Sequence, residues 1–106
     1  MRILLDECLD EGLRHQFGEL DCQTCRYAGF KGLSNGKLLA AAEAAGFDVL
    51  VTVDQNLAYQ QRMQGRRIAL LVLQARTTAF EDIIPLLTKA LAALENVQPG
   101  EVLRIN

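Results

Sequence analysis

The sequence predicts a three-layer α/β/α sandwich with a mostly parallel sheet, on the strength of two observations. Short apolar runs alternate along the chain with segments whose apolar residues recur every three or four positions, as expected of strands separated by helices. The two clearest runs, 48–53 and 68–73, are almost continuously apolar, which is typical of strands covered by helices on both faces. With 106 residues and no internal repeat or linker, residues 1–106 are predicted to form a single domain.

Five apolar runs are the predicted strands. They lie at 2–5, 21–26, 48–53, 68–73 and 101–105. The run at 48–53 is rich in valine, too short for a helix, and stops at Asp54. The runs at 21–26 and 101–105 are the weaker strand patterns.

Two helices are predicted in the first half of the chain. Leu9, Leu13 and Phe17 are spaced by four, so they mark one face of a helix that ends at Gly18. Ser34 is a predicted N-cap for a second helix, which runs to residue 45 and ends before a glycine.

Two more helices are predicted in the second half. A short polar helix covers 57–64. Thr78 and Glu81 have the spacing of a capping box, which predicts the start of the last helix, through residue 94. Pro85 requires either that this helix starts near Asp82 or that it is kinked at the proline.

Composition restricts where the protein acts and what it binds. The net charge is −2, so any contact with nucleic acid must come from a local basic patch. The longest apolar run, 68–73, is far shorter than the roughly 20 residues of a membrane-spanning helix. Asp6 and Glu7 come too early for a signal peptide, and three cysteines, an odd count, fit a reducing compartment. We therefore expect a cytoplasmic protein with no membrane segment.

Acidic residues follow two of the predicted strands. Asp6 and Glu7 come after the first strand, and Asp54, followed by Asn56, comes after the third. If the two strands are neighbours, these carboxylates converge at the carboxyl edge of the sheet, where their repulsion calls for a cation. Oxygen ligands favour Mg²⁺ or Mn²⁺. The alternative is that Asp54 only caps the next helix and that Asp6 and Glu7 only favour a helix N-terminus.

The segment Thr52-Val53-Asp54-Gln55-Asn56-Leu57 resembles the T-x-D-x-[D/N]-[F/L] signature of PIN-domain nucleases. Leu4-Leu5-Asp6-Glu7 matches the acid that ends the first strand in that family. The stretch from Gly32 to Ala42 is similar to the second helix of a small PIN-like branch found in bacterial toxin–antitoxin loci. The resemblance covers essentially the whole chain.

The resemblance implies a metal-dependent endoribonuclease that cleaves single-stranded RNA, the toxin of a toxin–antitoxin pair whose partner is an antitoxin protein. It implies that Asp6 and Asp54 are metal ligands, that Asn56 takes the place of a further acid, and that Glu7 joins the catalytic set. Many relatives carry an acid where this chain has Asn35. We therefore expect one well-bound metal ion rather than two, which would hold a phosphate oxygen and activate a water molecule.

Several residues are candidate contacts for the RNA backbone. They are Arg26, Lys31, Lys37 and Asn35, in the glycine-containing loop and the helix after it. A second basic cluster contains Arg66 and Arg67, which we interpret as solvated charges at the start of a strand. Glu43 could replace the missing acid only if it faces the site.

The cysteines and the single histidine allow other kinds of site. Cys22 and Cys25 have a C-x-x-C spacing, but structural zinc needs four ligands and a redox pair belongs at a helix N-terminus. We interpret them as core cysteines, placed in a strand. His15 lies between polar residues and is interpreted as a surface residue.

Two alternative functions and one association remain open. A receiver-type signalling domain also carries acids at these strand ends, but it needs a lysine at the end of the last strand, where this chain has Arg104. A catalytically weak PIN-like scaffold that binds a partner protein is favoured by Asn35. The last helix is apolar over more than one face, which predicts a homodimer or a bound antitoxin segment.

Overall fold

The computed structural model describes residues 1–33 and 35–106, apart from the side chain of Asn35. The predicted N-cap at Ser34 and the predicted RNA contact of the Asn35 side chain therefore lie outside the described residues.

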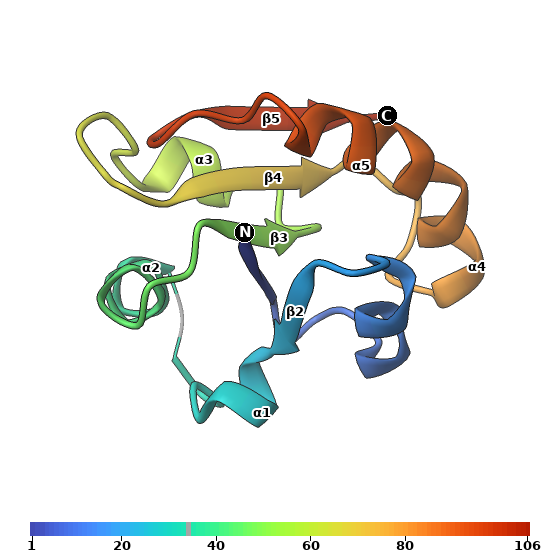
Figure 1. The fold of residues 1–106 in the computed structure, drawn as a ribbon, viewed down its shortest axis with the longest axis horizontal. Helices are drawn as coiled ribbons and strands as arrows, with labels where there is room; N and C mark the ends of the chain where they lie inside the picture. Colours follow the sequence, from blue (N-terminus) through green and yellow to red (C-terminus); the bar gives the residue numbers. More distant parts are fainter. Residues whose placement is uncertain (34) are drawn as a thin grey trace.

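The fold is α/β, built on one sheet of five parallel strands in the order β2-β1-β3-β4-β5 (Figure 1). Its strands are β1 (Arg2–Leu5), β2 (Asp21–Thr24), β3 (Val49–Thr52), β4 (Ala69–Leu73) and β5 (Val102–Ile105). The predicted fold class is thus confirmed. The sequence also predicts that the strand at 2–5 is central and lies next to the strand at 48–53. The two strands are neighbours, but β3 and not β1 is the middle strand.

Helices cover both faces of the sheet, as Figure 1 shows. They are η1 (Glu11–Gln16), α1 (Cys25–Ala28), α2 (Asn35–Ala44), α3 (Leu57–Gln60), α4 (Phe80–Ile83), η2 (Ile84–Leu86) and α5 (Leu87–Leu94). Successive strand residues point to opposite faces, so Leu5 packs in the core with η1, α4 and α5, whereas Leu4 packs in the core with α2 and α3. The strands are continuously apolar because each face has its own core.

Two predicted element boundaries are wrong, because nearby side chains bond the backbone first. The strand predicted at 21–26 stops at Thr24, whose hydroxyl accepts a hydrogen bond from Tyr27 N at 3.1 Å and caps α1. The capping box of Thr78 and Glu81 is absent. Instead the hydroxyl of Thr77 accepts a hydrogen bond from Ala79 N at 3.0 Å. The first bond caps α1 at a threonine that the sequence pattern did not select, whereas α4 has Ala79 at its N-cap and no side-chain capping bond.

The helical segments are shorter or more broken than their apolar patterns indicate. The first is a 3₁₀ helix that begins at Glu11, after Asp10, whose carboxylate accepts a hydrogen bond from Gly12 N at 2.7 Å. The last splits into α4, η2 and α5, because Pro85 sits in the 3₁₀ turn between them. Of the two alternatives for Pro85, the structure shows the interruption at the proline, because α4 already begins at Phe80. α3 stops at Gln60 rather than at residue 64.

The last helix hides most of its apolar surface inside the chain. Leu87, Ala90 and Leu94 are buried, while Leu91 and Ala93 are partly buried against the same core. The apolar surplus that predicted a homodimer or a bound antitoxin segment is therefore largely covered. Within residues 1–33 and 35–106, the helices are too short or too polar to cross a membrane.

Candidate functional site

Asp6 and Asp54 lie at the same edge of the sheet because β1 and β3 are paired. Leu5 is in register with Val51, and the N–H of Asp6 continues the ladder by donating to the carbonyl of Val51 at 2.9 Å. The carboxyl ends of the two buried strands thus bring both acids to the same edge of the sheet, which a shared site requires.

The hydroxyl of Thr52 connects the two acids. It donates a hydrogen bond to Oδ2 of Asp6 at 2.6 Å and accepts one from the N–H of Asp54 at 3.0 Å. The side chain of Asp6 therefore lies within two hydrogen-bond lengths, roughly 6 Å, of the Asp54 backbone. Thr52 is fully buried, so the link is held rigidly. We did not assign a role to Thr52 from the sequence, although its place two residues before Asp54 was the available signal.

The other oxygen of Asp6 and one oxygen of Asp54 accept backbone hydrogen bonds. Oδ1 of Asp6 accepts the N–H of Glu7 at 2.8 Å, and Oδ1 of Asp54 accepts the N–H of Asn56 at 3.0 Å. The capping alternative is therefore right in part, because Asp54 holds the turn that leads into α3. No hydrogen bond to Oδ2 of Asp54 is found within the described residues, and that carboxylate is exposed to solvent. Asn56 stands at the N-cap of α3 without a side-chain capping bond.

Glu7 is turned toward the loop before α2. Its Oε1 accepts a hydrogen bond from the N–H of Gly32 at 2.8 Å. Gly32 has a φ of +86°, a conformation that glycine adopts without strain. Glu7 therefore ties this loop to the end of β1, and part of its capacity as an acceptor is already used.

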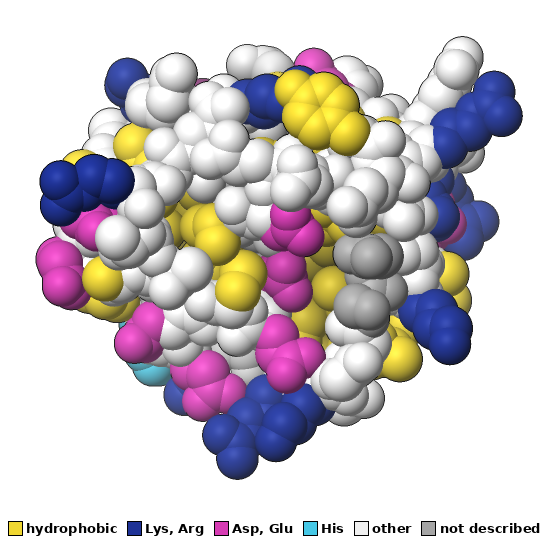
Figure 2. All heavy atoms as spheres, turned by 180° about the vertical axis from the view of Figure 1, so that it is seen from behind, with side chains coloured by type: hydrophobic (Ala, Val, Ile, Leu, Met, Phe, Trp, Pro, Cys, Tyr) yellow, Lys and Arg dark blue, Asp and Glu magenta, His cyan; other side chains and the backbone are white. Residues whose placement is uncertain are grey.

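A pocket of about 250 Å³ opens beside these acids. Its lining residues are Asp6, Glu7, Leu9, Glu11, Thr24, Cys25, Arg26 and Lys31. Two predicted acids and two predicted RNA contacts thus share one hollow, whereas Asp54 does not line it and Lys37 is exposed on α2. Figure 2 shows acidic side chains in the middle of this side of the molecule and Lys and Arg side chains below them.

The cysteine in the pocket is held in its neutral form. Burial, followed by the negative charges of Asp6 and Glu7, raises the pKa of Cys25 to about 12. Burial, followed by the charge of Asp21, likewise raises the pKa of Cys22 to about 12. Cys25 begins a helix rather than lying in a strand, so the predicted placement is wrong. The interpretation as a core residue is nevertheless confirmed for Cys25, which is buried, and a reactive thiol would need a lowered pKa.

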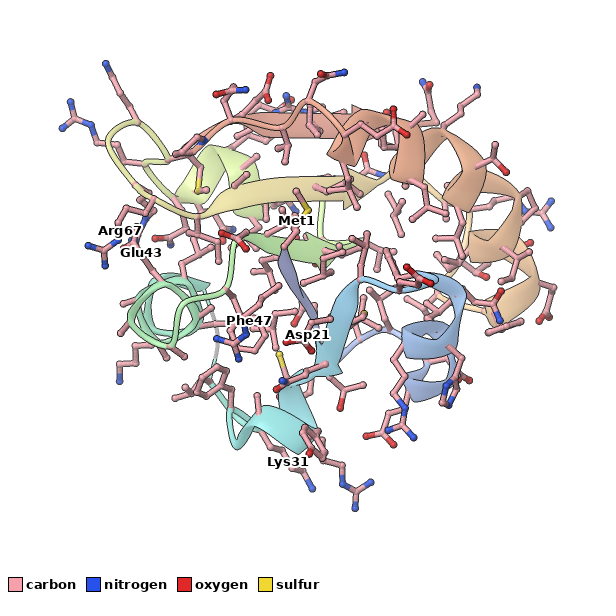
Figure 3. The ribbon with its side chains drawn as sticks, viewed as in Figure 1. Met1, Asp21, Lys31, Glu43, Phe47 and Arg67 are labelled. Carbon is pink, nitrogen blue, oxygen red and sulfur yellow. The ribbon has the colours of Figure 1, made fainter. Side chains whose placement is uncertain are left out.

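Glu43 lies at the amino edge of the sheet, opposite to the carboxyl edge that carries Asp6 and Asp54. Its carboxylate accepts a hydrogen bond from the N–H of Arg67 at 2.5 Å and lies 3.4 Å from the guanidinium of Arg66. Figure 3 shows Glu43 and Arg67 together near the start of β4, away from Lys31. Glu43 cannot replace the missing acid of the site, and Arg66 is an ion-pair partner rather than a solvated charge.

The carboxyl edge carries oxygen donors of the type that a hard divalent cation binds. Within the part of the chain that the structure describes, no three His, Cys, Asp or Glu side chains lie close enough to hold an ion together. Mg²⁺ is often held by one or two carboxylates and completes its shell with water and phosphate oxygens. Asp6 and Asp54 supply that number of carboxylates, and Asn56 adds an amide oxygen on the turn beside them.

Comparisons with family models, with curated proteins and with solved structures found no match to this chain.

Proposed function

We propose that this protein is a metal-dependent endoribonuclease of PIN type that cleaves single-stranded RNA and acts as the toxin of a toxin–antitoxin pair. The observation that carries the proposal is the Thr52 hydroxyl, which links Asp6 on one strand to Asp54 on the next. This link supports a shared site because it holds both acids on a rigid sheet edge. The T-x-D pattern of the sequence places the threonine where the link requires it.

In this proposal Asp6 and Asp54 hold Mg²⁺ or Mn²⁺, which when bound polarises a phosphate and lowers the pKa of water. The protein's own contribution is orientation. Thr52 fixes the plane of the Asp6 carboxylate, and the N–H of Asn56 fixes that of Asp54. Arg26 and Lys31, on the pocket wall beside Asp6 and Glu7, bind phosphates of the RNA strand.

Water, rather than a protein side chain, is the nucleophile in this proposal. The thiol in the pocket, Cys25, has a pKa of about 12 and stays protonated near neutral pH. His15 is exposed on η1, where its Nε2 accepts a hydrogen bond from Arg14 Nε at 3.3 Å. Neither group supports a covalent intermediate, so the reaction is a direct hydrolysis of the phosphodiester.

The test is cleavage of a single-stranded RNA with Mn²⁺ or Mg²⁺. Asp54→Asn and Asp6→Asn should each lower the rate by roughly 100-fold or more, because the swap keeps the shape of the side chain but removes the charge that binds the metal. Glu95→Gln, an exposed carboxylate at the end of α5, is the matched control and should cleave like the parent. Cleavage that survives both aspartate substitutions, or that ignores EDTA, contradicts the proposal.

A second candidate is a PIN-like scaffold that binds a partner without cutting RNA. It is favoured because two acids that could have joined the metal site make structural hydrogen bonds instead. Glu7 holds Gly32 and Glu43 holds Arg67, so both are engaged in bonds with the backbone. Parent protein that binds Mn²⁺ at Asp6 and Asp54 but never cleaves RNA would favour the scaffold.

A further inference from the structure

Tyr59 is among the most exposed large apolar side chains, with 77% of its surface accessible to solvent. It lies in α3, which follows the Asp54 turn directly. The N–H of Tyr59 donates to the carbonyl of Asn56 at 3.0 Å, and the N–H of Asn56 donates to Oδ1 of Asp54 at 3.0 Å. The backbone that carries the tyrosine ring is therefore tied to the backbone that carries the candidate metal ligand.

Arg104 joins this ring from a distant part of the chain. Its guanidinium carbon lies 5.2 Å from the centroid of the Tyr59 ring, a cation–π contact. Arg104 is in register with Val72, one residue before the end of β5. It is exposed, and within the described residues it takes part in no ion pair. An open aromatic ring and an uncompensated positive charge thus stand together near the carboxyl edge.

We propose that Tyr59 and Arg104 bind an unpaired base and its phosphate, on the strand whose neighbouring phosphate lies at Asp6 and Asp54. This inference rests on the proposed function and adds the residues that select an unpaired strand. The ring of Tyr59 stacks on the base, while Arg104 holds the ring and neutralises the adjoining phosphate. Bases inside a duplex have no free face for such stacking, whereas single-stranded RNA offers its bases to aromatic side chains.

Tyr27 provides a matched comparison. It is 75% exposed, almost as much as Tyr59, but it lies on α1 and lines a pocket with Arg14 and Asp21. No guanidinium lies over its ring in the described part of the molecule. Exposure alone therefore does not distinguish the two tyrosines, and the difference lies in Arg104 and in the link to Asp54.

The chain allows a direct optical test, because it contains two tyrosines and no tryptophan. In Tyr27→Phe all of the tyrosine emission comes from Tyr59, and in Tyr59→Phe all of it comes from Tyr27. The probes are a short oligouridylate in EDTA, which prevents metal-dependent cleavage, and an abasic strand with the same phosphates. We expect the oligouridylate to quench Tyr59 strongly and Tyr27 little, and the abasic strand to quench neither.

Affinity gives a second readout on the same proteins. Tyr59→Ala should weaken oligouridylate binding by roughly 5-fold to 100-fold, as expected for the loss of one stacked base. It should leave binding of the abasic strand unchanged. Tyr59→Phe keeps the stacking ring and should bind like the parent, and Tyr27→Ala is the control and should also bind like the parent.

Three results would overturn this inference. Equal oligouridylate affinity of Tyr59→Ala and the parent would refute the stacking role, and the proposed function would stand if the parent still cleaves RNA with Mn²⁺. Self-association that Tyr59→Ala abolishes, seen by analytical ultracentrifugation, would make this surface a contact between copies of the chain. A parent that neither binds nor cleaves RNA would refute the inference and the proposed function together.

Discussion

The two edges of the sheet use charged side chains differently. At the amino edge, where Figure 3 labels Asp21, Glu43 and Arg67, acids meet basic partners: Arg2 lies 3.3 Å from Asp21, and Arg66 lies 3.4 Å from Glu43. At the carboxyl edge, Asp6 and Asp54 instead meet a hydroxyl and backbone N–H groups. Both ion pairs found in the described residues belong to the amino edge.

This difference separates structural charges from charges that are free to bind a ligand. A carboxylate that receives a guanidinium and a backbone N–H, as Glu43 does, is neutralised by the protein itself. A carboxylate that receives only dipoles keeps its full negative charge, which a cation can then bind. The comparison therefore predicts that substitutions at the amino edge lower stability and that substitutions at the carboxyl edge change ligand binding.

The largest effect on stability is expected for Glu43→Ala. The change leaves the N–H of Arg67 and the partly buried guanidinium of Arg66 without their acceptor, so we expect a loss of about 1–3 kcal/mol in the free energy of unfolding. Glu19→Ala is the control, because Glu19 is exposed and makes no hydrogen bond in the described residues, and it should change stability by less than about 0.5 kcal/mol. Urea unfolding of both variants measures the difference.

The contribution of Glu43 to the free energy of unfolding should also depend on pH, and the pKa of Glu43 gives the direction. The N–H of Arg67, more than any other group, lowers the pKa of Glu43 from its ordinary value of 4.5. Because this pKa is lower in the folded protein than in the unfolded chain, the ionised Glu43 stabilises the fold at every pH above the ordinary pKa. This stabilisation is lost as the pH falls through the pKa of the folded protein. The gap between parent and Glu43→Ala should therefore be full at pH 6 and shrink below about pH 4. A gap that is constant with pH would show that the charge of Glu43 contributes nothing.

A smaller change in the free energy of unfolding is expected at alkaline pH, where the two thiols with raised pKa values ionise. Cys22 and Cys25 titrate near pH 12 in the folded protein against an ordinary value of 9.0. The unfolded chain therefore loses their protons first, so their contribution is complete below pH 9 and is lost between the two values. By pH 10 the parent should lose on the order of 1 kcal/mol for each thiol relative to pH 8.

The double variant Cys22→Ala/Cys25→Ala isolates this contribution. It should be less stable than the parent at pH 8, because it loses packing, but its stability should change less between pH 8 and pH 10. Urea midpoints at the two pH values provide the measurement. Equal pH dependence of parent and double variant would mean that the thiols are not held neutral by the fold.

The smallest change in stability is expected at the carboxyl edge. Asp54→Asn keeps a side-chain acceptor for the N–H of Asn56 and removes a negative charge, whereas Asp6→Asn keeps an acceptor for the N–H of Glu7 but replaces the oxygen that accepts from the Thr52 hydroxyl. Without metal, Asp54→Asn should therefore be as stable as the parent within about 0.5 kcal/mol, and Asp6→Asn should lose no more than about 1 kcal/mol, for the hydrogen bond of the Thr52 hydroxyl. Thermal unfolding in EDTA tests this, and a loss beyond about 2 kcal/mol would place these carboxylates with the structural charges of the amino edge.

The sequence predicted the features that depend on long apolar runs. The continuous pattern at 48–53 and 68–73 indicated strands that are covered on both faces, and β3 and β4 are such strands. Strand adjacency then followed from the acids, because Asp6 and Asp54 needed neighbouring strands to meet, and β1 pairs with β3. Local pattern and tertiary packing agree in this part of the molecule.

What could not be predicted depends on single side chains that bond across the fold. Thr24 caps α1 inside an extended pattern, and the N–H of Ala79 bonds to the hydroxyl of Thr77 instead of Thr78 and Glu81 forming a capping box, because hydroxyl geometry rather than spacing decides which local hydrogen bond forms. Glu43 shares its helix with Lys37, a predicted RNA contact, but its side chain turns to Arg67, 24 residues away in sequence. Thr52 links Asp6 and Asp54 through hydrogen bonds that no periodicity encodes.

The change in Tm when Mn²⁺ is added tests the central claim that the carboxyl edge holds an uncompensated pair of acids. The parent should gain roughly 4 °C or more in Tm when Mn²⁺ is added in large excess over its Kd. Asp6→Asn and Asp54→Asn should lose that shift, whereas Glu43→Ala should start from a lower Tm and show the same shift as the parent. An equal shift in all four proteins, or no shift in the parent, would contradict the account.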